Sequence, residues 1–442
     1  MTSALFSRCT AAMFAFLFLF SAGTVSARQT TAFVGVSVLP MDSERVLEDQ
    51  TVLVEGDRIV AVGPSGEVRV PDEATVIQGE GRYLMPGLAE MHGHIPPPSQ
   101  SAAVIEETLF LYAASGITTV RGMLGYPGQL ALKERANAGA LWSPSLYLAG
   151  PSFNGSTVSS PEQAAARVRE QVDAGWDLLK IHPGLSRAQY DAMADTAHEL
   201  GITFGGHVPA AVGVDHALDK GQETFDHVDG YVEALGGGTR SINMMELNRL
   251  VNKTVAGGAW VVPTMALWET LFVAVPLEEL QSYDELKYVS QAAVDSWSNQ
   301  YRSRAASGQY ANGAAVIAAR MQVLSALHKG GARILMGTDA PQQFSVPGFS
   351  LHRELAVMAD AGMTPYEIIV TGTRNVGDYF AHKDVFGLVA EGHRADLLLV
   401  NRNPFEHVGH LSDHAGVMIR GRWLSRDAID TRLAEIEARH AR

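Results

Sequence analysis

The segment MPGLAEMHGH (residues 85–94) decides the fold and the chemistry that this sequence predicts. Its apolar part is typical of a short strand, in which successive side chains point to opposite faces. His92 and His94 are two residues apart, so their imidazoles share one face and could bind one metal ion. A lone His-x-His spacing often arises by chance, so the interpretation depends on the rest of the chain.

Further residues that can bind a metal each lie at the end of an apolar run: Lys180, His207, His227 and Asp339. Lys180 belongs to the run LLKI (residues 178–181), an unusual place for a free ammonium group. Taken singly, these residues could be a surface lysine, two buried histidines and a helix cap. Their joint placement favours a metal site.

The middle of the chain alternates short apolar runs with helical patterns, which is typical of parallel βα units. Helices are expected at 161–173 and 186–200, and strands are expected at 88–94, 117–122, 145–149, 177–182, 202–208, 224–228, 259–264 and 333–339. This pattern predicts an α/β protein with a (β/α)₈ TIM barrel. Active sites of such barrels lie at the carboxyl ends of the strands, where all the candidate ligands fall.

The two ends of the chain have short β patterns separated by turn residues. We expect residues 28–85 and 386–425 to form one small β-sandwich domain, with the barrel at 86–385. A stretch at 265–312 is too long for a simple loop and predicts a helical insertion. Residues 426–442 predict a closing helix.

Residues 1–27 have the pattern of a secretory signal peptide. Arg8 precedes an apolar run at 11–20, and the segment ends in Val25-Ser26-Ala27. The alternative is an uncleaved membrane anchor, but the run is short against the roughly 20 apolar residues that span a bilayer. We therefore expect export to the periplasm or secretion.

The amino-acid composition limits the kinds of binding partner that we expect. The chain has 48 acidic residues against 34 lysines and arginines, a formal net charge of −14, which disfavours nucleic acid and anionic membranes. The single cysteine, Cys9, lies in the predicted signal peptide, so no thiolate would serve as a ligand or nucleophile. We expect a small-molecule substrate and no stable membrane association after signal cleavage. Homo-oligomer formation is left open.

These motifs resemble the amidohydrolase superfamily, and within it the imidazolonepropionase-like and prolidase-like enzymes. The resemblance covers residues 31–425 and rests on MPGL (85–88) with His92-x-His94, GITTVR (116–121), WDLLKI (176–181), GTDA (337–340) and ADLLL (395–399). Two positions depart from the family pattern. Glu90 stands where Asp is usual, and Gly122 stands where an Asp commonly follows the arginine. These departures leave the ligand set intact and put the substrate class in doubt.

The resemblance implies a binuclear site in which Lys180 is carboxylated by CO₂. One ion would take His92, His94, Asp339 and the carbamate, and the other would take the carbamate, His207 and His227. Nitrogen and oxygen ligands suit Zn²⁺, with Mn²⁺ or Co²⁺ as alternatives. A shared hydroxide would attack a carbonyl carbon, and Asp339 would act as general base.

Four further residues are candidates for the site. Tyr231 could donate a hydrogen bond to the substrate carbonyl oxygen, or be an ordinary loop tyrosine. Arg121 could bind a substrate carboxylate, or pair with an acidic side chain. His182 and Trp268 are candidate substrate-binding residues. We expect specificity loops at 95–100, 151–159, 228–240 and 265–312.

The resemblance implies hydrolysis of amide (C–N) bonds in dipeptides, N-acyl amino acids or related carboxamides. A lactonase or phosphotriesterase-like hydrolase is the alternative enzyme, because the same hydroxide could serve it. Deamination is disfavoured, since the deaminases of the superfamily use one metal and lack the lysine. A catalytically inactive scaffold is the alternative from another class, and the complete ligand set argues against it.

Overall fold

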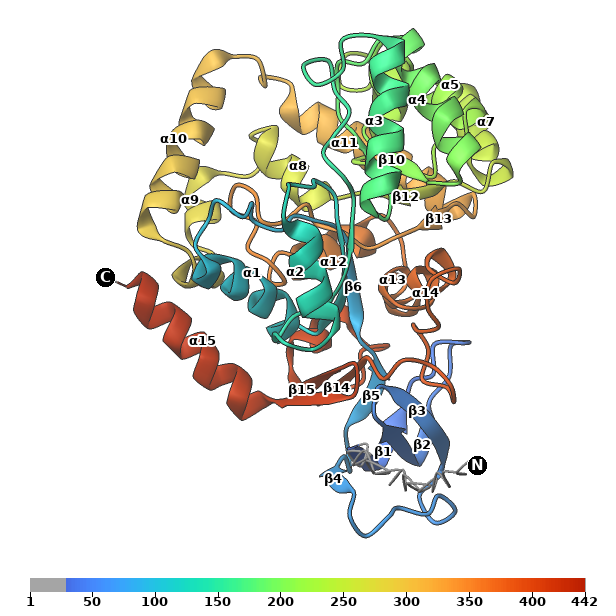
Figure 1. Ribbon diagram of the computed structural model, residues 1–442. Coiled ribbons are helices and arrows are strands. Elements are labelled where there is room, and N and C mark those ends of the chain that lie inside the picture. Colours follow the sequence, from blue (N-terminus) through green and yellow to red (C-terminus); the bar gives the residue numbers. More distant parts are fainter. Residues whose placement is uncertain (1–28, 442) are drawn as a thin grey trace, which may run out of the picture.

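The computed structural model describes residues 29–441, so the predicted signal peptide lies outside the described residues. Within this range no helix is both long enough and apolar enough to cross a membrane. Parallel strands occupy the centre, helices surround them, and a separate mixed sheet lies at the lower end in Figure 1.

The lower sheet combines both ends of the chain. Its amino-terminal strands are β1 (Thr30–Val38), β2 (Leu47–Glu55), β3 (Arg58–Pro64), β4 (Thr75–Gln78) and β5 (Tyr83–Pro86). Its carboxyl-terminal strands are β14 (Leu397–Val400), β15 (His414–Ile419) and β16 (Arg422–Ser425). The two groups meet where β14 runs antiparallel to β5, with Leu398 opposite Met85. All eight strands belong to one mixed sheet, so the predicted two-layer β-sandwich is not confirmed.

The central strands are parallel and lie within the eight predicted runs. They are β6 (Leu88–Gly93), β7 (Ile117–Gly122), β8 (Ser145–Leu148), β9 (Leu179–Ile181), β10 (Phe204–Gly206), β11 (Thr224–Asp226), β12 (Trp260–Val262) and β13 (Arg333–Ile334). They form a three-stranded sheet, β6-β7-β8, and a five-stranded sheet, β13-β12-β11-β10-β9. The described residues therefore show an α/β fold without one closed barrel sheet. The strands β9 to β13 are only two or three residues long, and regular pairing stops at both edges.

Isolated backbone contacts span the two gaps between these sheets. Ala149 and Leu178 form a parallel bridge between the chain that follows β8 and the chain that precedes β9. On the other side, the Met91 N–H donates to the Met336 carbonyl (2.8 Å), and the Asp339 N–H donates to the His92 carbonyl (2.8 Å). The carboxyl end of β6 is therefore held directly against the segment that follows β13.

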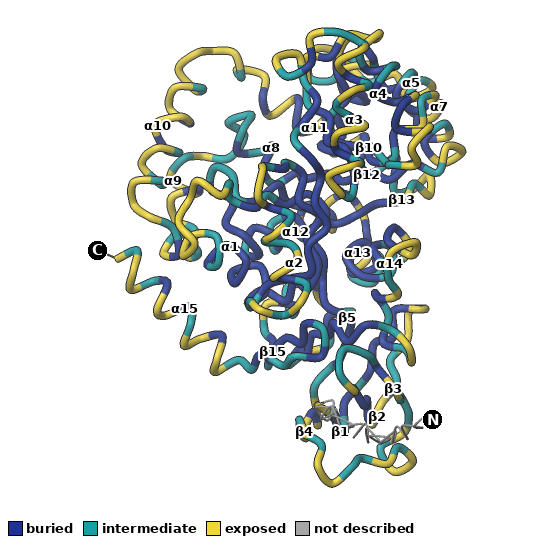
Figure 2. The backbone as a smooth tube through the Cα atoms, viewed as in Figure 1, coloured by how far each residue is buried: buried dark blue, intermediate teal, exposed yellow. Residues whose placement is uncertain are grey.

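Helices cover the central strands, which are mostly buried in Figure 2. Every residue of β6 and β7 is buried, as expected for parallel strands covered on both faces. The covering helices are α1 (Ala102–Ala114), α2 (Gln129–Asn137), α3 (Pro161–Ala174), α4 (Arg187–Leu200), α5 (Val214–Asp219), α6 (Tyr231–Ala234), α7 (Met244–Ala256), α11 (Gly313–Lys329), α12 (Leu351–Asp360), α13 (Pro365–Gly372) and α14 (Arg374–Tyr379).

Side chains at the start of α3 and α4 explain why these helices begin where they do. Ser160 accepts a hydrogen bond from the Gln163 N–H, and Pro161 occupies the first turn of α3. Ser186 and Gln189 form a reciprocal capping box at the start of α4. Both helices match the ranges predicted from helical periodicity to within one residue.

Between β12 and α11 the chain forms four helical segments, of which α9 and α10 lie on the left of Figure 1. They are α8 (Met265–Leu271), α9 (Leu277–Gln281), the 3₁₀ helix η1 (Asp284–Tyr288) and α10 (Gln291–Ser307). A second 3₁₀ helix, η2 (Val408–Ser412), precedes β15. The last helix, α15 (Arg426–His440), buries Ile429, Leu433 and Ile436 and contacts α1.

Arg394 joins the lower sheet to the central strands and has no exposed side-chain surface. Its guanidinium donates to Asp396 (2.6 Å) and Asp384 (2.8 Å), and to Thr119 Oγ1 on β7 (2.9 Å). A buried cation is tolerated only when acidic partners and hydrogen-bond acceptors surround it. Arg394 meets this requirement at the junction of the two sheets.

Replacing Arg394 with methionine should strongly destabilise the protein, because Asp396 would remain buried without its cation. We expect the Arg394→Met change to lower the free energy of unfolding by about 3–5 kcal/mol in urea denaturation followed by circular dichroism. Arg402→Met is the control, since Arg402 pairs with Asp413 at an exposed site (3.2 Å) and should cost less than about 1 kcal/mol. Equal effects of the two changes would contradict the assignment.

Candidate metal centre

The predicted ligands lie at the carboxyl ends of five central strands. His92 and His94 lie at the end of β6, and Lys180 lies within β9. His207 and His227 follow β10 and β11 directly, and Asp339 follows β13. His227 and Asp339 have left-handed backbone conformations, with φ of 66° and 65°. Such strained conformations recur at functional sites. They direct a side chain towards the site that would point elsewhere if the strand continued regularly.

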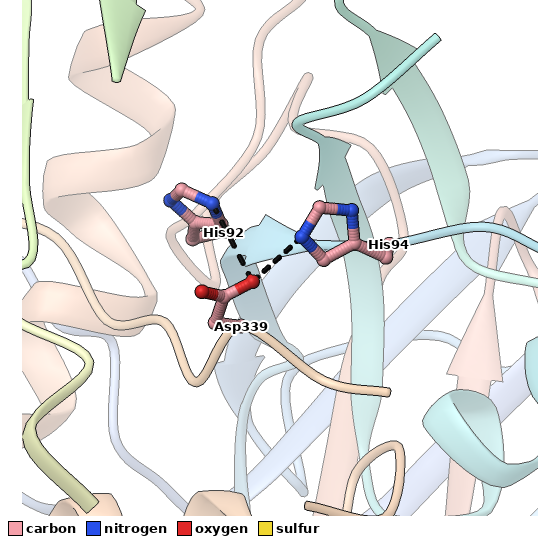
Figure 3. Close-up of side chains that lie close together, drawn as sticks. All are labelled: His92, His94 and Asp339. Carbon is pink, nitrogen blue, oxygen red and sulfur yellow. Dashed lines mark hydrogen bonds and ion pairs between the residues drawn. The ribbon is translucent and has the colours of Figure 1, made fainter. Parts of the chain in front are cut away.

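His92, His94 and Asp339 form a compact cluster (Figure 3). Asp339 Oδ1 lies 2.6 Å from His94 Nε2 and 3.6 Å from His92 Nε2. One nitrogen or oxygen atom from each residue lies within 4.8 Å of the other two. Burial would raise the pKa of Asp339, but His92 and His94 hold it well below its ordinary value. The cluster therefore offers an anionic carboxylate and two imidazoles to a cation.

Lys180 lies beside this cluster and is completely buried. Its Nζ is 3.1 Å from His92 Nε2. Burial lowers the pKa of Lys180 to about 8, although the charges of Asp226 and Asp339 oppose that shift. Burial and the charge of Lys180 lower the pKa of His92 to about 4, so His92 is neutral near pH 7. A neutral imidazole is the form that binds a metal ion.

His207 and His227 lie on the other side of Asp339. Their ring centroids are 4.4 Å apart, and the His227 ring lies 4.5 Å from that of His92. His227 Nε2 is 3.8 Å from Asp339 Oδ2, so the two oxygens of Asp339 face different histidines. Asp339 therefore contacts three of the predicted ligands, while Lys180 lies beside His92 and His207 lies beside His227.

Three of the histidines are held through Nδ1. His92 Nδ1 lies 2.6 Å from Asp226 Oδ2, and His207 Nδ1 lies 2.6 Å from Asp229 Oδ2. His227 Nδ1 lies 2.6 Å from Thr264 Oγ1. Such partners fix the orientation and tautomer of a metal-binding imidazole, leaving Nε2 for the metal.

Arg121 takes part in this support. It is fully buried, and its guanidinium lies 3.3 Å from Asp226 Oδ2, with further hydrogen bonds to Met91 O and Thr224 Oγ1. Burial would raise the pKa of Asp226, but Arg121 and His92 hold it well below its ordinary value. Of the two roles that the sequence allowed for Arg121, this geometry matches the pair with an acid and leaves no exposed face for a substrate carboxylate.

Arg320, on α11, supports the site in the same way as Arg121, but it was not predicted from the sequence as a site residue. It donates to the His227 carbonyl and to Asp229 Oδ1 (3.2 Å), and its guanidinium lies over the Trp268 ring, 4.4 Å from the centroid. The sequence could have indicated it, because Arg320 shares a helix face with apolar Val316, Ile317 and Val323. A charged residue on such a face needs a buried partner.

Glu90 joins the two sides of the site. Its carboxylate accepts hydrogen bonds from the His92 N–H (3.0 Å), the Thr338 N–H (2.8 Å) and the Thr338 hydroxyl (2.5 Å). Burial raises its pKa to about 8, and these hydrogen bonds oppose the shift. Glu90 thus ties His92 to the residue before Asp339.

The other candidate residues are placed differently. The Tyr231 hydroxyl is hydrogen-bonded to Thr254 Oγ1 on α7 (2.6 Å), and no hydrogen bond found in residues 29–441 joins it to a ligand. Its proposed contact with a substrate oxygen therefore has no support in this geometry. His182 stacks on His207, with centroids 5.0 Å apart, and burial lowers its pKa to about 2. Trp268 contacts His227 edge-on, with centroids 5.5 Å apart.

The donor set fits a metal ion. His227 Nε2 is buried, faces Asp339 and has no hydrogen-bond partner among the described residues. A buried polar atom without a partner is costly unless something else satisfies it. The other donors are imidazole nitrogens and a carboxylate, which suit Zn²⁺, Mn²⁺ or Co²⁺.

Sequence comparison places the chain in a family. Residues 83–424 match the model of the Amidohydrolase family, which covers the central strands, the helical insertion and the last strands of the lower sheet. The chain therefore belongs to the amidohydrolase family, whose members are metal-dependent. This agrees with the resemblance seen in the sequence motifs.

Two relatives show how far this chain has diverged in sequence from other proteins that it matches. An ochratoxinase from Aspergillus niger is 23% identical over 425 residues, 88% of this chain and 84% of that protein. An adenine deaminase from Ruegeria sp. (strain TM1040) is 26% identical over 207 residues, 43% of this chain. The chain spans only 34% of that deaminase.

Solved structures share the fold. A putative prolidase from Bifidobacterium longum superposes with a TM-score of 0.71 at 23% identity, covering 93% of this chain and 99% of that one. The bottromycin amidohydrolase superposes with a TM-score of 0.72 at 21% identity, covering 93% and 90%. At these identities the likeness supports the fold alone.

Removal of one imidazole from the cluster should weaken metal binding. We expect His94→Ala to lose most of its bound metal after dialysis against a weak chelator, because the cluster would lose one of its two imidazoles beside Asp339. Elemental analysis would measure the metal that remains. His198→Ala is the matched control, since His198 is exposed and bonds the Lys220 carbonyl. Equal metal retention by the two variants would refute the ligand assignment.

Proposed function

We propose that this protein is a binuclear metal-dependent hydrolase that cleaves amide (C–N) bonds. His92, His94 and Asp339 would hold one ion, His207 and His227 would hold the other, and a carboxylated Lys180 would join them. The proposed substrates are dipeptides, N-acyl amino acids or related carboxamides. Within this proposal the two parallel sheets act as one (β/α)₈ barrel, linked by the backbone contacts across both gaps.

The position of Lys180 carries this proposal. The Lys180 amine is fully buried and lies 3.1 Å from an imidazole nitrogen. If it stayed a positively charged ammonium group, it would repel the cation that the site binds. The neutral amine can add to CO₂ and release one proton, which gives a carbamate whose single negative charge is shared by two oxygens. Such a group would supply the ligand that lies between the two sets of histidines.

The ions, when bound, would polarise the substrate carbonyl and lower the pKa of water. The residues of the chain then orient and move protons. Asp339, between both sets of histidines, would accept the proton of the attacking water and deliver it to the departing amine nitrogen. Asp226, Asp229 and Thr264 would keep each Nε2 directed at the site.

Loss of the lysine should separate this proposal from a one-metal site. We expect Lys180→Ala to lower kcat/KM for N-acyl amino acids at least about 100-fold and to reduce bound metal from about two ions per chain. Short carboxylic acids should restore part of the activity by replacing the carbamate. Unchanged activity and unchanged metal content would overturn the carbamate assignment.

Arg320 should control the second set of histidines selectively. We expect Arg320→Met to lower the affinity for the second ion by about 10- to 100-fold and to spare the first, because Asp229 would lose its cation. Isothermal titration calorimetry with the metal ion would resolve the affinities of the two sites. Arg402→Met is the control, since Arg402 pairs with Asp413 at an exposed site and contacts no ligand. A uniform loss at both sites would refute a selective role.

A further inference from the structure

A cavity of about 620 Å³ opens beside His94. Its walls come from segments that are far apart in the sequence: the loop after β6, helix α1, the helical insertion and the loop after Asp339. Apolar side chains dominate these walls, including Ile95, Pro97, Leu111, Val289, Trp297 and Pro347. Small-molecule sites commonly have volumes of about 300–1,000 Å³, so the cavity can hold a substantial part of a substrate.

The cavity adjoins the metal centre at His94. His94 forms part of its wall, and so does Gln342, whose amide donates to Asp339 Oδ1 (3.3 Å). The His94 N–H donates to the Ala340 carbonyl (2.7 Å), which holds the two loops together at the inner end. A substrate whose carbonyl lies at the metal centre can therefore extend a side group into the cavity.

The charges in the wall are already paired. Glu107, which is 4% exposed, pairs with Arg439 and with His440 (3.5 Å) at the end of α15. His94 faces Asp339 (2.6 Å). Among residues 29–441, each charged side chain of the cavity wall thus has an oppositely charged partner, whereas the apolar surface of the wall favours a neutral group.

We infer that this cavity is the specificity pocket of the enzyme and takes a bulky, neutral, apolar group of the substrate, aromatic or branched aliphatic. The inference rests on the proposed hydrolase function and narrows its substrate class. Substrates with a small group or a charged group at this position gain little from the apolar wall, since burial of apolar surface provides the attraction.

Two valines allow a matched test. Val104 on α1 lines the cavity and is 38% exposed, so a tryptophan there can fill the cavity without displacing the core. Val255 on α7 is 41% exposed and lies outside the cavity wall. Both variants carry the same change in side chain, and only Val104→Trp narrows the pocket.

Selectivity is measured as the ratio of kcat/KM for two amide substrates that differ only in one neutral group, benzyl against methyl. Each side of the amide is varied in turn. We expect the native protein to prefer the benzyl substrate at least 10-fold on one side. Val104→Trp should reduce that ratio at least 10-fold, and Val255→Trp should keep it. No preference in the native protein, or equal ratios in both variants, would overturn the inference.

Equilibrium binding separates failure of the pocket from failure of the hydrolase. The probe is 3-phenylpropanol, which has no amide bond to hydrolyse, and propanol is its small counterpart. Their binding is measured by saturation-transfer NMR in a titration. We expect binding of the phenyl probe to weaken at least 10-fold in Val104→Trp and to remain in Val255→Trp. If no amide is hydrolysed and this pattern holds, the pocket stands and the hydrolase proposal falls. If amides are hydrolysed without this pattern, the pocket assignment falls.

Discussion

The hydrogen bond from the Asp339 N–H to the His92 carbonyl is the constraint on which the site depends. It joins the end of the first central strand to the segment beyond the last, although β6 and β13 belong to different sheets. Glu90 strengthens the same junction through the His92 and Thr338 N–H groups. A ligand cluster drawn from residues 92 and 339 can form only because these backbones are in register.

The electrostatic support of the site follows one scheme twice. Arg121 pairs with Asp226, which orients His92, and Arg320 pairs with Asp229, which orients His207. Each arginine stabilises a buried carboxylate that would otherwise be costly, and each carboxylate fixes an imidazole. The outer layer therefore sets the direction of Nε2 for histidines on both sides of Asp339, independently of any ion.

The sequence predicted those features that depend on position along a strand. His92, His94, Lys180 and Asp339 were found because each ends or interrupts an apolar run, and the carboxyl ends of parallel strands meet at one edge. The closure of the barrel and the two-layer form of the terminal sheet are not confirmed, because both depend on pairing between segments far apart in the chain. Strands of two or three residues, such as β13, give too little pattern to fix that pairing.

Side-chain direction was the other limit. Arg121 was a correct candidate for a pair with an acid, but only the folded chain shows that Asp226 is its partner. Tyr231 follows His227 by four residues, yet α6 directs its hydroxyl to Thr254 on α7. Arg320 could have been recognised, because a cation among Val316, Ile317 and Val323 predicts a buried partner. Sequence spacing thus locates a residue on an element, and tertiary packing decides what its polar end meets.

Apart from His94, which belongs to both, the ligands and most of the cavity wall come from different parts of the fold, which separates chemistry from specificity. The ligands lie on strand ends that are held by buried hydrogen bonds and ion pairs. Much of the cavity wall belongs to α1 and to the helical insertion, and the insertion is largely exposed in Figure 2. Substitutions in these outer segments can change the shape of the cavity without moving the hydrogen bond between Asp339 and His92. The same metal centre can therefore serve different substrates when only the outer wall changes.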